Sequence, residues 1–193
     1  MASGQVLRRP ATAGLSLVSD ARSVTLAPLH GLSRFAVRAD QDAAALVGRA
    51  FGCPLPTEPL RSTAQEGRTA LWLGPDEWLL LAEEVEPEAV MREVAAALGE
   101  RAFSFVDISH RNAGFLLSGP HATEVLNAGC PLPLDLRSFP VGKCTRTLFG
   151  KAEIVLWRVG ENAFRIEVWR SFAAYLAGLV AEAAREHQIA PIR

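Results

Sequence analysis

A regular pattern begins at residues 33–39, where apolar residues alternate with polar ones as they do in a half-buried strand. Asp40 then occupies the position of a helix N-cap. Apolar residues recur behind it at helical spacing, which predicts a helix that Gly52 and Pro54 end. The predicted buried face of this helix consists of Ala43, Leu46, Val47 and Ala50.

Two apolar strands and a second helix follow. The strands are predicted at residues 69–73 and 77–82, with a turn at 74–76 between them. Pro87 suits the first turn of a helix. The predicted buried face of that helix consists of Val90, Val94, Ala97 and Leu98.

After Gly99 a similar order of elements begins again. Further strands are predicted at residues 102–109, 112–118, 143–149, 152–159 and 163–170. A short helix through Ala122 and Leu126 stops at Gly129, and the proline-rich residues 131–142 predict a loop. Ser171 is expected to cap the last helix. Its predicted buried face consists of Phe172, Tyr175, Leu176, Leu179, Val180 and Ala183.

These elements predict an α+β protein made of two loosely repeated β-α-β-β-α subdomains with antiparallel sheets. We expect a flexible N-terminal arm at residues 1–25, a first subdomain at 26–100 and a second at 101–193. The arm reads as neither a secretory signal nor a membrane segment, with a transit peptide as the alternative. The repeat is one of pattern rather than of residues.

Composition narrows the class of protein. The 193 residues are 49% hydrophobic and 21% charged, which is typical of a folded globular protein. A net charge of -1 gives no basic excess for nucleic acid, and no apolar run approaches the ~20 residues that span a bilayer. The three cysteines, Cys53, Cys130 and Cys144, lie far apart, so we expect packed, reduced thiols in a cytoplasmic protein.

The strand faces suggest that part of the sheet surface is covered. Residues 152–159 are apolar on both faces, whereas Arg165, Glu167 and Trp169 give residues 163–170 one mostly polar face. The cover is either the other half of this chain, which we favour, or a second chain. Trp169 stands among charged residues, as aromatic residues at partner interfaces do. The predicted interface residues are Trp169, Trp157, Arg170, His110 and Arg111.

Candidate chemistry is sparse. Asp107, Ser109 and His110 contain the residue types of a hydrolase, but members of a catalytic triad normally come from separate elements, so we favour polar groups that bond a turn. A second set of residues could bind an anion such as a folate tail, although a solvated strand face is the interpretation we favour. This set is Arg146, Arg158, Arg165 and Arg170. Neither a phosphate-binding loop nor a dinucleotide fingerprint is present.

The histidines do not pair with carboxylates at helical spacing, so we expect no metal site in this chain. They are His30, His110, His121 and His187.

Four stretches together resemble the gamma subunit family of heterotetrameric sarcosine oxidase. They are LWLGPDEWLL at residues 71–80, DISHRN at 107–112, FPVG at 139–142 with Arg146 and Thr147, and VWRSFAAYL at 168–176. The resemblance implies a cytoplasmic complex of alpha, beta, gamma and delta chains that oxidises sarcosine to glycine, forms hydrogen peroxide and passes the one-carbon unit to tetrahydrofolate. It also implies that FAD, FMN, NAD and zinc are held by the other subunits, with no cofactor in this chain.

A more distant resemblance links residues 107–110 and 118–122 to the folate-dependent aminomethyltransferases of the glycine-cleavage T-protein family, and implies their fold. The acidic pair of that family matches Ala152 and Glu153, so one carboxylate is absent and the other lies one methylene further out. Because even a ~1 Å misplacement costs catalysis heavily, we expect a related fold without the chemistry. Our main hypothesis is a non-catalytic subunit. The alternatives are a stand-alone folate-binding or aminomethyl-transfer protein and, more remotely, a Ser109–His110 hydrolase.

Overall fold

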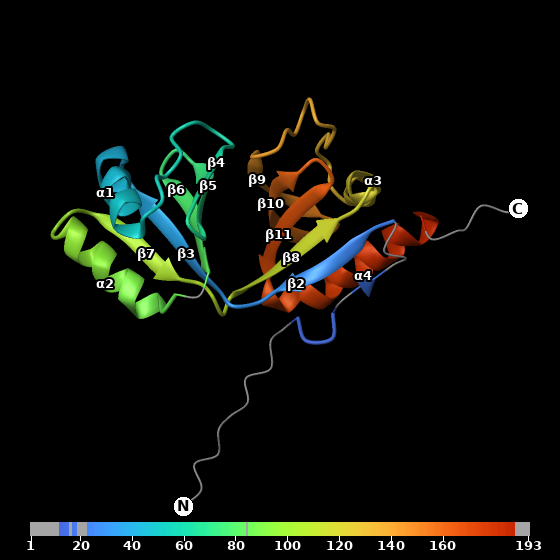
Figure 1. Cartoon of the computed structure of the whole chain (residues 1–193), viewed down its shortest axis with the longest axis horizontal. Coiled ribbons are helices and arrows are strands. Elements are labelled where there is room, and N and C mark those ends of the chain that lie inside the picture. The colour runs from blue at the N-terminus through green and yellow to red at the C-terminus, as the bar shows by residue number, and fades with distance from the viewer. Residues whose placement is uncertain (1–11, 16, 19–22, 84, 188–193) are drawn as a thin grey trace, which may run out of the picture.

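The computed structural model describes residues 12–15, 17–18, 23–83 and 85–187. Figure 1 shows two antiparallel sheets that face each other, with helices on their outer faces. The chain is therefore an α+β protein, as predicted.

The first sheet has the strand order β4-β5-β6-β3-β7, with α1 and α2 on its outer face. Its strands are β3 (Leu32–Ala39), β4 (Ser62–Gln65), β5 (Arg68–Gly74), β6 (Glu77–Glu83) and β7 (Phe103–Asp107). The helices are α1 (Gln41–Phe51) and α2 (Pro87–Leu98).

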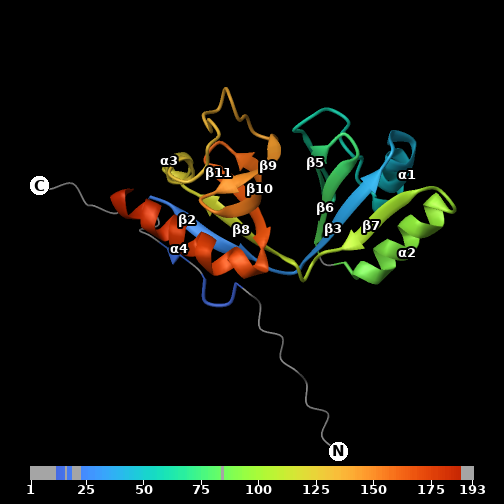
Figure 2. The ribbon, with the colours of Figure 1, turned by 180° about the vertical axis from the view of Figure 1, so that it is seen from behind.

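The second sheet has the order β1-β2-β8-β11-β10-β9. Its strands are β1 (Leu17–Val18), β2 (Thr25–Leu29), β8 (Asn112–Ser118), β9 (Cys144–Phe149), β10 (Ala152–Gly160) and β11 (Ala163–Trp169). The helical elements are α3 (Ala122–Asn127), η1 (Arg170–Phe172), α4 (Ala173–Ala184) and η2 (Arg185–His187). Figure 2 shows α4 lying across the outer face of β2 and β8. Residues 131–142 form a loop, as predicted.

The two sheets repeat one topology. In each, a strand and a helix lead into a run of three strands and a second helix: β3-α1-β4-β5-β6-α2 and β8-α3-β9-β10-β11-α4. The matching spatial orders are β7-β3-β6-β5-β4 and β2-β8-β11-β10-β9. The predicted duplication is therefore present, and β4, which was not predicted, lies at the edge equivalent to that of β9.

One strand of each sheet, β7 in the first and β2 in the second, comes from the other half of the sequence. β7 follows the predicted boundary near residue 100 but pairs with β3 of the first sheet, in the register Phe35↔Asp107. β2 precedes the first sheet but pairs with β8 of the second, in the register Leu26↔Leu117. The boundaries at 26–100 and 101–193 thus separate both strands from their sheets. Apolar alternation predicts a strand but carries no information on its neighbour.

The flexible arm predicted for residues 1–25 falls partly outside the described residues. Where the structure describes it, the prediction is wrong. Leu17 and Val18 pair with β2, and Val24 is 3% exposed in the core of the second half.

Local sequence signals account for both ends of α1. Asp40 Oδ1 accepts a hydrogen bond from Ala43 N at 2.8 Å, and Gly52 ends α1 with a left-handed φ of 73°. Three expectations are wrong. Ala97 is exposed, and Ser171 does not cap α4, because it lies within the η1 turn and α4 begins only at Ala173. Phe172 and Tyr175, expected on the buried face of α4, also lie at the surface.

The repeat also includes residues, so the prediction of a repeat in pattern alone is wrong. Residues 52–56 and 129–133 both read GCPLP, and each copy lies between a helix and an edge strand. The Sγ atom of the first cysteine, Cys53, lies 3.6 Å from Thr63 Oγ1 in β4. Cys130 lies 3.9 Å from Thr147 Oγ1 in β9. The two cysteines therefore occupy equivalent sites.

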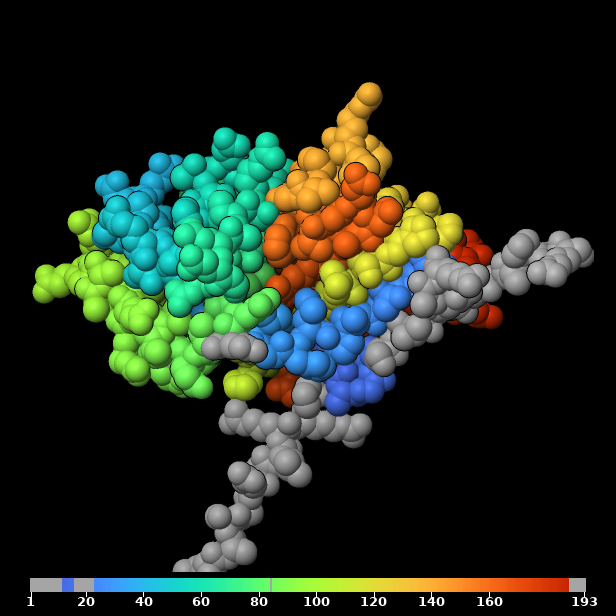
Figure 3. All heavy atoms as spheres, in the orientation of Figure 1, coloured from blue at the N-terminus to red at the C-terminus, as the bar shows by residue number. Residues whose placement is uncertain are grey.

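The core has three parts. Each sheet packs its outer face on its own helices, and a third cluster lies between the sheets. The buried members of that cluster are Leu71, Leu79, Leu81, Ile108 and Cys144. Figure 3 shows the atoms of the two halves meeting along the face in view. The sheets thus cover each other, which was the cover we favoured.

The edges of the two sheets are also joined. Ser62 N donates to Gly142 O at 3.2 Å and Cys144 N donates to Leu60 O at 2.9 Å. No helix among the described residues is long and apolar enough to cross a membrane.

Candidate functional site

Four of the five predicted interface residues lie together where β7 crosses into β8 and β11 ends. Trp169 is 47% exposed, and the Arg111 guanidinium carbon lies 5.4 Å from the centroid of its ring. Arg170 N donates a hydrogen bond to Arg111 O at 2.8 Å. His110 is exposed beside Arg111 in the chain. We call these four residues (His110, Arg111, Trp169 and Arg170) the Trp169 surface.

Two further aromatic residues follow along the chain. Phe172 and Tyr175 are 38% and 39% exposed, and their rings meet edge to face at 6.2 Å. Tyr175 Oη accepts a hydrogen bond from Lys151 N at 3.1 Å. The sequence pattern had placed both rings on the buried face of α4, so this exposed aromatic pair was missed.

Trp157, the fifth predicted interface residue, lies elsewhere. Its half-buried ring packs against the cluster between the sheets. Its Nε1 atom is buried and has no hydrogen-bond partner among the described residues. The structure therefore does not bring Trp157 to the Trp169 surface.

The polar residues at 107–112 bond a turn, as favoured from the sequence. Asp107 Oδ1 accepts hydrogen bonds from Ser109 Oγ and, at 2.8 Å, from Ser109 N. Ser109 Oγ also accepts from Arg34 N at 2.9 Å. Asp107 and Ser109 are thus engaged in fixing the crossover between β7 and β8.

The four arginines of the last strands do not form one site. Arg146 pairs with Glu77 at 2.5 Å, and hydrogen bonding to Glu77 raises the pKa of its guanidinium above the ordinary value. Arg158 is buried on the helix side, where its Nη1 donates to Leu134 O at 2.7 Å and to Phe139 O at 2.8 Å.

Arg165 is buried between the sheets, whereas Arg170 belongs to the Trp169 surface. The solvated strand face is therefore wrong for Arg158 and Arg165. The sequence could not show which surfaces the protein itself covers.

The buried charges between the sheets were not predicted. Arg34 Nε on β3 lies 2.5 Å from Glu167 Oε2 on β11. Arg165 donates to the other carboxylate oxygen, from Nε at 3.0 Å and from Nη2 at 2.8 Å. Glu167 therefore accepts hydrogen bonds from arginines of both sheets. The Arg165–Glu167 alternation was visible in the sequence, but its third member, Arg34, is 133 positions from Glu167.

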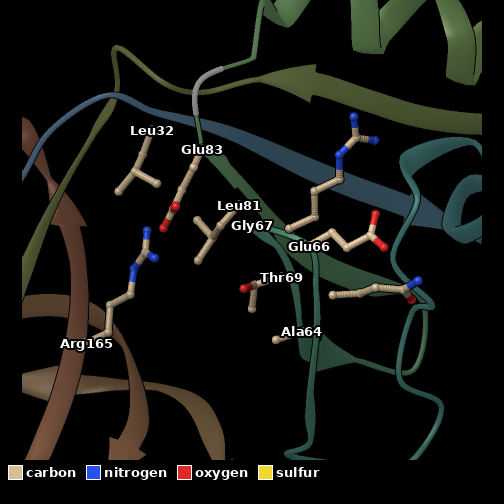
Figure 4. Close-up of a pocket in the computed structure, with 10 residues that line it drawn as sticks. Leu32, Ala64, Glu66, Gly67, Thr69, Leu81, Glu83 and Arg165 are labelled. Atoms are coloured by element: carbon tan, nitrogen blue, oxygen red, sulfur yellow. The ribbon is translucent and has the colours of Figure 1, made fainter.

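A cavity of ≈ 230 Å³ lies beside this ion pair, between β11 and the first sheet. Figure 4 shows Arg165 and Glu83 pointing into it from opposite walls. Thr69, Leu32 and Leu81 also line it.

The three cysteines are buried free thiols. Cys144 lies in the cluster between the sheets, and burial raises the pKa of its thiol to about 12. A thiol with this pKa stays protonated at neutral pH and is a poor nucleophile. No group of three or more metal-ligating side chains occurs within the described part of the chain.

Comparison with known proteins identifies the family. Residues 36–186 match the model of the sarcosine oxidase, gamma subunit family. The chain belongs to this family. It is 32% identical to the sarcosine oxidase subunit gamma of Corynebacterium sp. (strain U-96), over 96% of this chain and 94% of that protein. It is 34% identical to the subunit gamma of an Arthrobacter species, over 77% and 73% of the two chains.

Solved structures extend the family likeness to the fold. A chain of the heterotetrameric sarcosine oxidase from Corynebacterium sp. U-96, in complex with pyrrole 2-carboxylate, has a TM-score of 0.88 and 31% identity. The match covers 97% of this chain and 100% of that one. Aminomethyltransferase T of the glycine cleavage system from Bartonella henselae has a TM-score of 0.64 and 16% identity, over 88% of this chain and 48% of that one. This confirms the expected aminomethyltransferase-like fold.

Proposed function

We propose that this chain is the non-catalytic gamma subunit of a heterotetrameric sarcosine oxidase, in which it contributes to assembly and stability. The observation that carries the proposal is the match, over almost the whole of both chains, to a chain of that assembly. Its partners are the alpha, beta and delta subunits.

A structural role fits the state of the candidate catalytic groups. Asp107 and Ser109 bond the crossover turn. Glu153, the remaining carboxylate of the T-protein-like pair, is more than half exposed and lies 3.7 Å from Arg146 Nε in an ion pair. Glu153 also lines a small second cavity between the sheets, together with Arg146 and Trp169, whereas none of these three carboxylate and hydroxyl groups lines the cavity beside Arg165. Asp107 and Ser109 therefore already have a structural role.

The Trp169 surface is the part of the chain that we assign to a partner. It combines a half-exposed tryptophan with two exposed arginines, the residue types that contribute most to protein interfaces. No carboxylate within the described residues forms an ion pair with Arg111 or Arg170, so a partner with acidic groups complements this surface.

The chemistry of the complex belongs to the other subunits in this proposal. They hold FAD, FMN, NAD and zinc, oxidise sarcosine and transfer the one-carbon unit to tetrahydrofolate in the cytoplasm. This chain needs no cofactor for an assembly role.

Co-purification tests the proposal. The tagged chain, expressed with its alpha, beta and delta partners, is expected to retain flavin-containing subunits through washes at mild salt. An untagged chain in the same cells is the control for non-specific capture. Recovery of the tagged chain alone contradicts the proposal.

Folate titration separates this role from that of a stand-alone folate-binding or aminomethyl-transfer protein. We expect the isolated chain not to bind tetrahydrofolate, because Ala152 replaces one carboxylate and Glu153 pairs with Arg146. Tight binding that is lost in Glu153→Gln supports the stand-alone protein instead.

A further inference from the structure

The cavity between the sheets has one wall built around a buried cation. Arg165 is 9% exposed, and its Nε and Nη2 atoms both donate to Glu167 Oε1. No hydrogen bond joins Arg165 Nη1 to any residue that the structure describes. Because Glu167 fixes the rest of the guanidinium, Nη1 remains as a positioned donor for a bound molecule.

The buried charges beside the cavity are not balanced. The side chains of Arg34, Arg165 and Glu167 are 5%, 10% and 1% exposed, so two cations share one carboxylate away from water. Arg34 Nη2 is buried and has no hydrogen-bond partner among the described residues. An excess of buried positive charge is costly unless an anion compensates it. A carboxylate that accepts a hydrogen bond from Arg165 Nη1 would add to this compensation.

The rest of the lining carries two carboxylates, Glu83 and Glu66, and one further cation, Arg68. Figure 4 shows the Glu83 carboxylate, from β6, directed toward Arg165 across the cavity. No ion pair between these two side chains occurs in the described structure. Thr69 adds a hydroxyl, and Leu32 and Leu81 add apolar surface.

Size sets a further limit on the ligand. A water molecule takes roughly 30 Å³ of liquid volume, so ≈ 230 Å³ holds several waters or one small metabolite. The molecule that matches both walls carries a carboxylate and an ammonium group a short distance apart.

We propose that this cavity binds a small zwitterionic amino acid, with its carboxylate at Arg165 and its ammonium group toward Glu83. The site is distinct from the Trp169 surface. It does not depend on the assembly role, so either proposal can fail without the other.

Calorimetric titration of the full chain tests the site with three probes: glycine, acetate and methylammonium. Acetate carries only the carboxylate of glycine, and methylammonium carries only its amine. We expect saturable binding of glycine and binding of each fragment that is weaker by at least about tenfold.

Two variants assign the binding to the cavity. Glu83→Gln, which changes an exposed residue on its rim, is expected to weaken glycine binding by about tenfold without weakening acetate binding. Glu88→Gln is the matched control, since it removes the same charge from an exposed position of α2 that does not line the cavity. This control change should leave the affinity for glycine unchanged.

Three results overturn the proposal. They are no saturable binding of glycine up to about 10 mM, acetate binding as tight as glycine binding, and an equal loss in the Glu83→Gln and Glu88→Gln variants. Co-purification with the partner subunits, measured on the same preparations, distinguishes failure of this site from failure of the assembly role.

Discussion

Arg34 on β3 and Glu167 on β11 form an ion pair across the space between the two sheets, with 2.5 Å between Nε and Oε2. The pair joins the first sheet to the central part of the second. Both side chains are buried, so water competes little for their charges. The contact therefore specifies how one sheet is placed on the other.

Replacement of Glu167 by glutamine should destabilise the protein strongly. The change leaves Arg34 and Arg165 as buried cations without a counter-charge, which costs about 3 kcal/mol or more of the free energy of unfolding. Chemical denaturation measures this loss. Glu182→Gln is the matched control, since its ion pair with Arg185 is exposed and should contribute no more than about 0.5 kcal/mol. Equal effects of the two changes contradict a special role for the buried pair.

Gly114 is required by the same ion pair. A Cβ atom at this position would lie 2.6 Å from Arg34 Nη2 and 2.8 Å from Glu167 Oε1. We expect Gly114→Ala to reduce the free energy of unfolding by about 1–3 kcal/mol, because the pair must move. Gly178→Ala, at an open and exposed position of α4, should instead stabilise the chain by up to about 1 kcal/mol. Thermal unfolding of both variants compares the two glycines, and a neutral Gly114→Ala contradicts the steric argument.

Cys144 should make stability depend on alkaline pH. Burial raises its pKa to about 12 in the folded protein, whereas an unfolded cysteine titrates near 8.5. Between these values only the unfolded state loses the proton, so the unfolding free energy should fall as pH rises from about 8.5 toward 12. The slope contributed by this group approaches about 1.4 kcal/mol per pH unit.

Denaturation as a function of pH, in the protein and in Cys144→Ala, isolates this contribution. The difference between the two profiles should be flat below about pH 8 and should change above it. Identical slopes up to pH 11 show that the thiol does not titrate in this way.

Trp169→Ala should weaken assembly without unfolding the chain. The side chain is 47% exposed, so its loss should cost the isolated chain no more than about 1 kcal/mol. At an interface the same truncation costs about 2 kcal/mol or more, which is roughly 30-fold in affinity for the partner subunits. Leu136→Ala is matched for exposure, also 47%, and lies in the loop at 131–142. Partner affinities that fall equally in both variants rule out the Trp169 surface as the contact.

The sequence predicted the helices and strands better than it predicted which strands lie side by side in the sheets. Asp40 and Gly52 mark the ends of α1 because capping uses groups close in the chain. By contrast, β1, β2 and β4 were missed. The two-residue β1 and four-residue β4 are too short for a periodic pattern, and β2 contains Pro28, which weakens a strand assignment.

For the candidate sites too, the sequence did not show which surfaces are covered by distant parts of the chain. Trp169 stood out as an aromatic residue among charges, and it does lie at the surface. Arg165 and Glu167 looked solvated because an alternating strand is ordinarily polar on its wet face. Their burial depends on the first sheet, which covers that face from a distant part of the sequence.

The exchange of β2 and β7 between the sheets has a consequence for synthesis of the chain. β2 leaves the ribosome before any strand of the first sheet, yet its neighbour β8 ends only at Ser118. β2 therefore lacks its neighbour β8 until all five strands of the first sheet have been synthesised. A cut near residue 100 would leave each fragment without one of its own strands, so the two repeats are inseparable as folding units despite their common topology.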